Sequence, residues 1–157
     1  AKTYVDQLLK LNHDKPSNIL AGRIASKLGD IEAAQQYFDQ NNLIEDDESS
    51  LYYAAQAYLD NQQAHLGVAT LKPFLRVNKG SYQSYQLLSS LFVELGAFDR
   101  SHVQSAKALI VQGKLDKAIG HYERAKSVTH TQDLFDVLSV RIDNLQQTLD
   151  LYKDLPD

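Results

Sequence analysis

The breaks between predicted helices recur at a nearly fixed distance along this chain. Gly29 ends one stretch of apolar residues spaced three and four apart, Gln62-Gln63 ends the next, and Gly96 ends a third. Small residues stand 12 positions apart across each break; the pairs are Gly22 and Ala34, Ala55 and Gly67, Ser89 and Ser101, and Ala106 and Ala118 around Gly113. Small residues on both sides of a tight turn let two helices approach closely. The pattern predicts successive helix–turn–helix units with a period of about 34 residues.

Composition narrows the class of protein further. No stretch alternates with period two, so we expect an all-α chain of about nine helices. No apolar run approaches the roughly 20 residues of a membrane-spanning helix. The net charge is −4 with scattered basic residues, which argues against a nucleic-acid partner. The absence of cysteine excludes disulfides, thiolate catalysis and cysteine-ligated zinc.

The periodic pattern resembles tetratricopeptide repeats, whose small residues occupy equivalent positions. The strongest match is the set Ala106, Leu109, Gly113, Leu115, Ala118, Tyr122 and Ala125. The resemblance implies an α-solenoid of about four repeats plus a long C-terminal capping helix. The expected segments are the second helix of a truncated repeat at 1–12, repeats at 16–42, 49–78 and 81–112, a fourth repeat at 98–127 that shares a helix with the third, and a capping helix at 131–155.

A second resemblance lies in the C-terminal part of the chain. The runs 106–119 and 141–145 are similar to the C-terminal region of BepA/YfgC-like periplasmic zinc metallopeptidases. In that family a catalytic domain with His-Glu-x-x-His precedes the repeats, which hold the protease to outer-membrane assembly machinery and its β-barrel clients. The resemblance implies a periplasmic protein. Because the chain starts at Ala1 with no initiator methionine and no signal peptide, we expect it to be a piece of a longer protein.

The sequence lacks the spacing of known catalytic and metal-binding motifs. A zinc hydrolase needs two histidines one helical turn apart and a glutamate base, but none of the five histidines is four residues from another. No phosphate loop, nucleophile elbow or calcium loop is present. We therefore predict a non-enzymatic chain with no cofactor and no metal. The alternatives are an enzyme piece that uses scattered Asp, Glu and His residues, and a stand-alone repeat scaffold or adaptor of another complex.

The remaining candidate surface is the groove that stacked repeats create. The register of the family places in it Ile19, Arg23, Ser26, Lys27, Tyr52, Gln56, Leu59, Asp60, Gln83, Gln86, Ser90, Val93 and Glu94, and also Val103 and Lys107 if the helix shared by the third and fourth repeats leaves that face open. From these the predicted partner contacts are Arg23, Lys27, Tyr52, Gln56, Gln83, Gln86, Ser90 and Lys107. For each polar residue, a solvated helix face is an equally good interpretation.

Several finer expectations follow from the same register. Arg23 and Lys27 lie one turn apart, so together they could meet a carboxylate or an acidic segment of a partner. One of Tyr52 and Tyr53 is expected to face the core. The groove lacks the lysine and asparagine clamp that captures a free C-terminus, so its glutamines and tyrosines suit extended polypeptide better.

Two features lie outside the groove. A stripe of Leu134, Leu138, Ile142, Leu145, Leu149 and Tyr152 on the last predicted helix favours a capping role, with docking to a partner such as a catalytic domain as the alternative. Pro73 is expected to bend or end the helix that contains it.

Overall fold

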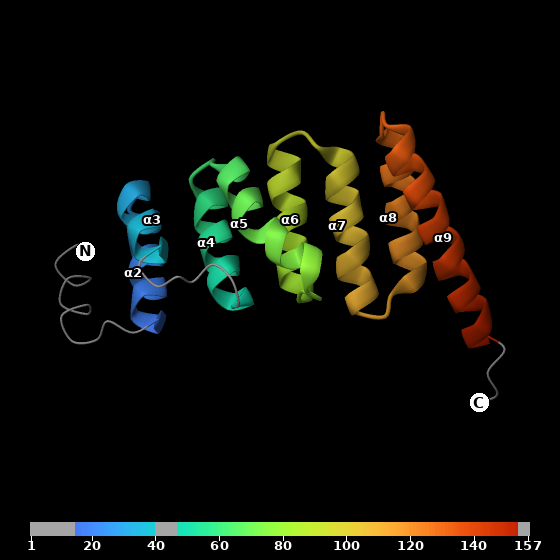
Figure 1. Cartoon of the computed structure of the whole chain (residues 1–157), viewed down its shortest axis with the longest axis horizontal. Helices are drawn as coiled ribbons and strands as arrows, with labels where there is room; N and C mark the ends of the chain where they lie inside the picture. Colours follow the sequence, from blue (N-terminus) through green and yellow to red (C-terminus); the bar gives the residue numbers. More distant parts are fainter. Residues whose placement is uncertain (1–14, 40–46, 154–157) are drawn as a thin grey trace. The chain divides into compact units, whose positions relative to one another are not determined.

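The computed structural model of the protein describes residues 15–39 and 47–153 (Figure 1). These ranges form eight α-helices and no strand, which confirms the all-α prediction. The helices are α2 (Lys15–Lys27), α3 (Ile31–Asp39), α4 (Glu48–Asp60), α5 (Ala64–Val77), α6 (Tyr82–Glu94), α7 (Phe98–Val111), α8 (Leu115–Val128) and α9 (Gln132–Lys153). The predicted helix at 1–12 lies outside the described residues.

The chain divides into two compact units. Unit 1 is Ala1–Gly80 and contains α2 to α5, whereas unit 2 is Ser81–Asp157 and contains α6 to α9. In unit 1, α2 packs against α3 and α4, and α4 packs against α5. In unit 2, α7 packs against both α6 and α8, and α8 packs against α9.

Four helices end in the same backbone conformation. Gly29, Gln62, Gly96 and Gly113 have φ angles of 77°, 60°, 68° and 71°. At each of them the N–H donates to the carbonyl three residues earlier, and the following N–H donates to the carbonyl five residues earlier, all at 2.9–3.0 Å. This is a Schellman closure, which glycine adopts without a Cβ penalty. Among the described residues, Gln62 is the only non-glycine residue with a positive φ. The turn at this position was predicted from the repeat spacing, because glutamine by itself does not indicate a turn.

The predicted small-residue pairs lie at the close approaches between helices. All eight members are buried. A Cβ added to Gly22 would stand 2.5 Å from the ring of Phe38 on α3, so any larger residue would force this ring to move. Ser89 and Ser101 join α6 to α7 through hydroxyl groups 2.9 Å apart. The predicted close approach is confirmed for Ser89 and Ser101, and Gly22 lies close to Phe38 of the facing helix; the other two pairs are buried as expected.

Each unit has its own apolar core. In unit 1, a cluster on α2, α3 and α4 centres on Phe38 and four alanines. In unit 2, α9 packs on α8, and its predicted stripe joins an apolar cluster that also holds residues of α7; Leu138 in this stripe is fully buried. Tyr152 departs from the prediction, because its side chain is 63% exposed and lies beyond the packed part of the stripe.

Pro73 lies inside α5 and does not end it. A proline removes one hydrogen bond from a helix and crowds the preceding turn. Here Leu71 and Leu75 flank Pro73 and are both buried. Packing of these neighbours holds the helix together across the lost bond, so the part of the prediction that allowed a helix end is wrong.

Candidate functional site

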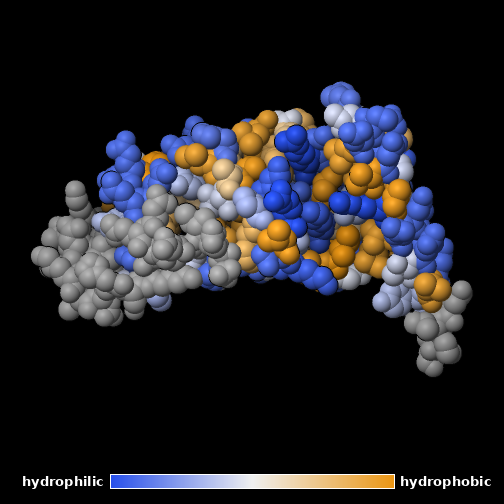
Figure 2. All heavy atoms as spheres, viewed as in Figure 1, coloured by the Kyte–Doolittle hydropathy of each residue, from blue (hydrophilic) through white to orange (hydrophobic). Residues whose placement is uncertain are grey.

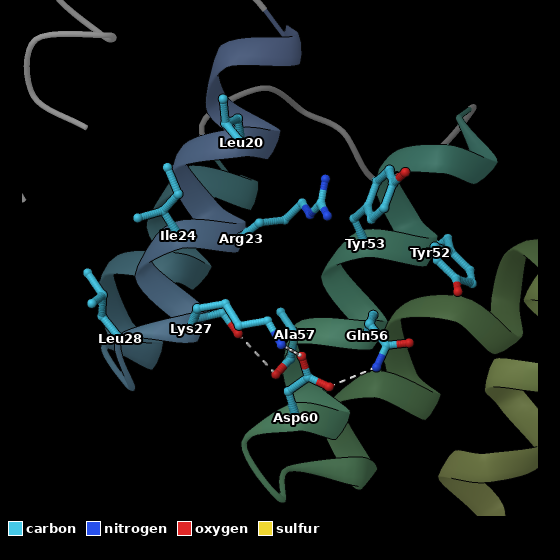
Figure 3. Close-up of a pocket in the computed structure, with 11 residues that line it drawn as sticks. Leu20, Arg23, Ile24, Lys27, Leu28, Tyr52, Tyr53, Gln56, Ala57 and Asp60 are labelled. Atoms are coloured by element: carbon cyan, nitrogen blue, oxygen red, sulfur yellow. Dashed lines mark hydrogen bonds and ion pairs between the residues drawn. The ribbon is translucent and has the colours of Figure 1, made fainter. Parts of the chain in front are cut away.

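A pocket of about 550 Å³ opens between α2 and α4 in unit 1. Four of the predicted partner contacts line it, namely Arg23 and Lys27 from α2, and Tyr52 and Gln56 from α4; Ser26 and Asp60, which the register also placed in the groove, line it too. In Figure 3 the side chains of Arg23 and Lys27 extend from α2 toward α4. A smaller adjacent pocket of about 280 Å³ shares Leu20, Arg23 and Tyr53 with it.

The back of the pocket is closed by Ser26, which the register had placed in the groove. Ser26 is only 4% exposed and its Oγ donates to the carbonyl of Ala57 at 3.3 Å. Asn61 Nδ2 in turn donates to Ser26 Oγ at 2.8 Å. Because Ser26 is small and hydrogen-bonded on both sides, it fastens α2 to α4 and is not available to a partner.

A polar network forms one end of the pocket (Figure 3). Asp60 accepts from Lys27 Nζ at 3.0 Å and from Gln56 Nε2 at 2.8 Å. Burial alone would raise the pKa of Asp60, but the hydrogen bonds from Lys27 and Gln56, with the charge of Lys27, outweigh it and lower that pKa. The carboxylate is thus kept ionised, and it neutralises Lys27 within the protein.

Arg23 is held differently. Its Cζ lies 4.4 Å from the centroid of the Tyr53 ring, a cation–π contact. The described residues include no ion-pair partner for it. Lys27 uses one of its three N–H donors on Asp60 and its side chain stays 77% exposed, so joint contact of Arg23 and Lys27 with a carboxylate or acidic segment stays a prediction.

The two tyrosines also differ from the prediction. Tyr52 and Tyr53 are both half-buried and both line the pocket, with ring centroids 5.5 Å apart in an edge-on arrangement. Neither faces the core, because Leu51, Ala54 and Ala55 already fill the buried face of α4. The pocket consequently has two aromatic walls where one was expected.

An apolar row on α2 completes the pocket. Leu20, Ile24 and Leu28 follow one another at single-turn spacing (Figure 3). Leu20 is 43% exposed and Leu28 is 56% exposed. Apolar side chains with this much exposure, beside a guanidinium that no described carboxylate neutralises, are typical of a surface that binds polypeptide.

The comparison with known families addresses this part of the chain. Residues 16–40 match the family model of the tetratricopeptide repeat. This segment is a tetratricopeptide repeat. It contains α3 and α2, and α2 forms one side of the pocket. Together with the helix pairs described above, this match confirms the all-α helical-repeat fold class. No curated protein matches the chain. Tetratricopeptide repeats generally mediate protein–protein interaction.

The other predicted contacts belong to unit 2. Gln83 and Ser90 are exposed on α6, Gln86 is half-buried, and Ser90 Oγ donates to the Gln86 carbonyl at 3.2 Å. Lys107 on α7 is half-buried, with its Nζ 5.7 Å from the Tyr85 ring centroid. Contact of these four predicted residues with a partner stays a prediction.

Sequence reasoning overlooked part of the repeat's pocket. Leu20, Ile24 and Leu28 were not among the predicted contacts, although their four-residue spacing is visible in the sequence. The register assigns groove residues by their position within the repeat. The exposure of these three side chains depends instead on which elements pack against α2, so the register did not include them. Tyr53 is not among the predicted contacts because the register places Tyr52 in the groove and one of the two tyrosines is expected to face the core.

Residues 15–39 and 47–153 contain no group of three or more His, Asp or Glu side chains placed to hold a metal ion. His102 and His121 do come together, with ring centroids 5.5 Å apart.

None of the described helices is long and apolar enough to cross a membrane.

Proposed function

We propose that this chain is a non-catalytic protein-interaction module that binds a segment of extended polypeptide in the pocket between α2 and α4. The observation that carries the proposal is the pocket itself, which combines an exposed apolar row, two tyrosines and an arginine with no ion-pair partner among the described residues. The tetratricopeptide repeat at 16–40 supplies the α2 side of this pocket.

Each part of the pocket has a role in this proposal. Leu20, Ile24 and Leu28 accept apolar side chains of the partner, and their burial supplies the free energy of binding. Arg23, oriented by Tyr53, donates to a carbonyl or carboxylate of the partner. Lys27 and Asp60 pair with each other across the two helices at the polar end of the pocket.

We further propose that the module is the repeat region of a periplasmic protease or chaperone that acts in outer-membrane protein assembly or quality control. The resemblance of 106–119 and 141–145 to BepA/YfgC-like metallopeptidases supports this. The partners would then be β-barrel proteins, their assembly machinery or the protease domain of the same protein. The parent gene tests the proposal, since it should encode a signal sequence and His-Glu-x-x-His upstream of Ala1. A gene without them would favour a stand-alone scaffold or adaptor.

The binding role is tested by selecting peptides for the purified chain from a random displayed library. Selected peptides should lose affinity for Arg23→Gln and Tyr52→Ala, both in the pocket, by at least about tenfold. Gln36→Ala is the matched control, because Gln36 is exposed on α3 and does not line the pocket. If the selected peptides bound the pocket variants and the control equally well, the pocket would not be the binding site.

A further inference from the structure

Two histidines from neighbouring helices of unit 2 lie side by side. His102 on α7 and His121 on α8 have ring centroids 5.5 Å apart, and their ring planes are tilted by 57°. The two helices pack directly against each other, so the backbones on both sides hold the rings together. Both histidines are half-buried, which leaves part of the pair open to solvent.

The separation of the two rings suits coordination of one metal ion. Zn–N bonds of about 2 Å in a tetrahedral arrangement place the centroids of two imidazoles on the same ion roughly 5 Å apart. The observed 5.5 Å is close to this value. Tilted rings can each direct a nitrogen at a common point, which two rings stacked face to face cannot do. The pair therefore needs little rearrangement to bind one ion through both rings.

One ring nitrogen of the pair lacks a hydrogen-bond partner. Nδ1 of His121 is buried and makes no hydrogen bond to any described residue. A buried polar atom without a hydrogen bond is costly, and such an atom in a native protein calls for an explanation such as a water molecule or an ion. A metal ion on this ring, or a water molecule held by that ion, would supply the missing partner.

The surroundings of the pair are partly apolar. His102 follows the buried Ser101, and His121 precedes Tyr122, which is 3% exposed. Figure 2 shows strongly hydrophilic residues set among hydrophobic ones over α6 to α9. An apolar shell restricts the access of solvent to a metal site. The open part of each ring still leaves room for water molecules as further ligands.

The charges near the pair favour neutral rings. Burial lowers the pKa of His102, and the charge of Arg124 lowers it further. Burial also lowers the pKa of His121, followed by the charges of His102 and Arg124. Metal ions bind the neutral imidazole, which is the form that this environment favours. Arg124 also repels a metal cation, but it is exposed on α8, so solvent and salt screen its charge.

We propose that His102 and His121 together bind one divalent transition-metal ion that prefers imidazole ligands, with water in the remaining coordination positions. Imidazole suits zinc, copper and nickel ions, whereas Mg²⁺ and Ca²⁺ prefer oxygen ligands. Such an ion joins α7 to α8 and therefore stabilises unit 2. The expectation of a chain without metal considered histidines one turn apart on a single helix, whereas this pair comes from two helices.

The test is calorimetric titration of Zn²⁺ into the full chain at pH 7.5, after removal of metal with EDTA. We expect saturable binding, and His102→Gln and His121→Gln should each weaken it by at least about tenfold. The matched control is His130→Gln, which changes an exposed histidine of unit 2 and should leave the affinity unchanged. Arg124→Gln should tighten binding, because it removes a like charge. Mg²⁺ should not compete.

NMR of the histidine ring nitrogens assigns the ligands directly. The signals of His102 and His121 should shift together and saturate at the same Zn²⁺ concentration, while those of His65 and His130 should not respond. Response of one ring alone, or affinity that is unchanged in His102→Gln and His121→Gln, would overturn the proposal. Absence of saturable Zn²⁺ binding would do the same and would leave the two rings as an aromatic contact.

Urea unfolding of the unaltered chain provides a measurement that does not depend on the variants. The urea midpoint should rise with added Zn²⁺ and return to its starting value with EDTA, because an ion that binds the folded state stabilises it. No rise at a Zn²⁺ concentration that saturates the calorimetric signal would contradict a site that joins two helices. Circular dichroism shows whether each variant keeps its helices, and either histidine variant that does so is sufficient for the calorimetric test.

Discussion

The ammonium group of Lys27 and the carboxylate of Asp60 lie 3.0 Å apart, although they belong to different helices one repeat period apart in the chain. The pair therefore joins equivalent ends of α2 and α4. It closes the polar end of the pocket, and Arg23 has no such ion-pair partner among the described residues.

The first prediction concerns this pair. Both side chains are accessible to solvent, so a double-mutant cycle of Lys27→Gln and Asp60→Asn should give a coupling free energy below about 1 kcal/mol that shrinks with added salt. Urea unfolding at low and high salt measures it. A coupling well above this range, unaffected by salt, would mean that the pair is shielded from solvent.

The second prediction concerns helix closure at Gln62. Gln62→Gly should raise the free energy of unfolding by about 1 kcal/mol, because glycine has no Cβ penalty at its φ of 60°. Gly96→Ala should lower it by a similar amount, since no atom lies within 4 Å of the added Cβ and only the backbone is strained.

A matched control for these variants is Gly120→Ala. Gly120 lies inside α8 with open space around it, so the change should stabilise the protein by up to about 1 kcal/mol. Opposite signs at Gly96 and Gly120 in urea unfolding would confirm that φ is the cause. The same sign at both positions would contradict it.

The third prediction concerns the contact of Gly22 with Phe38. Gly22→Ala should destabilise the protein by about 1–3 kcal/mol, because the new methyl group overlaps a ring that is itself only 4% exposed. Adding Phe38→Leu should recover part of that loss. If the double variant were as unstable as the sum of the single ones, the overlap would not be the source of the effect.

The fourth prediction concerns Ser89, whose Oγ lies 2.9 Å from the hydroxyls of both Ser101 and Ser105. Ser89→Ala should cost about 1 kcal/mol because it leaves two partners without their hydrogen bond. The double variant with Ser101→Ala should cost less than the sum, since it reproduces the Ala106 and Ala118 pair. Additive thermal or urea data would show that these hydroxyls are independent.

The fifth prediction concerns pH. Burial lowers the pKa of His102, with the charge of Arg124 adding to the effect; burial also lowers the pKa of His121, followed by the charges of His102 and Arg124. As pH falls through the ordinary value of 6.5, the unfolded chain therefore takes up protons that the folded one resists. Stability should be full above this pH and decline below it.

The urea midpoint at pH 7.5 and at pH 5.5 measures this decline. His121→Gln should reduce it, because one of the two opposed protonations is removed. His130→Gln, at an exposed position, should leave it unchanged. An equal decline in all three proteins would assign the effect to other groups.

The repeat architecture could be predicted because it depends on local and periodic features. Glycine or its substitute at a turn and small residues 12 positions apart act within one helix pair, so the sequence alone locates Gly22, Gly96 and Ala118. Gln62 illustrates this point. The turns at Gly29 and Gly96 lie about one period before and after it, and this spacing predicted a turn at Gln62, although glutamine does not favour a positive φ.

The pocket could be predicted only in part. The register named Arg23, Lys27, Tyr52 and Gln56, which do line it. It did not find the pairing of Lys27 with Asp60 or the stacking of Arg23 on Tyr53, because both depend on how α4 is rotated and offset against α2. Pro73 shows the same limit, since packing of its neighbours overrides its local preference.

Helix α7 begins directly after the closure at Gly96 and ends at the closure at Gly113, half a repeat period later, and it packs on both α6 and α8. A single helix here is the second member of one hairpin and the first member of the next. Duplication of such a segment would lengthen the protein by one helix instead of two. A helical array built in this way can gain one helix at a time. Its number of helices can then change from even to odd, which changes the helix face that lies uncovered at the end of the array.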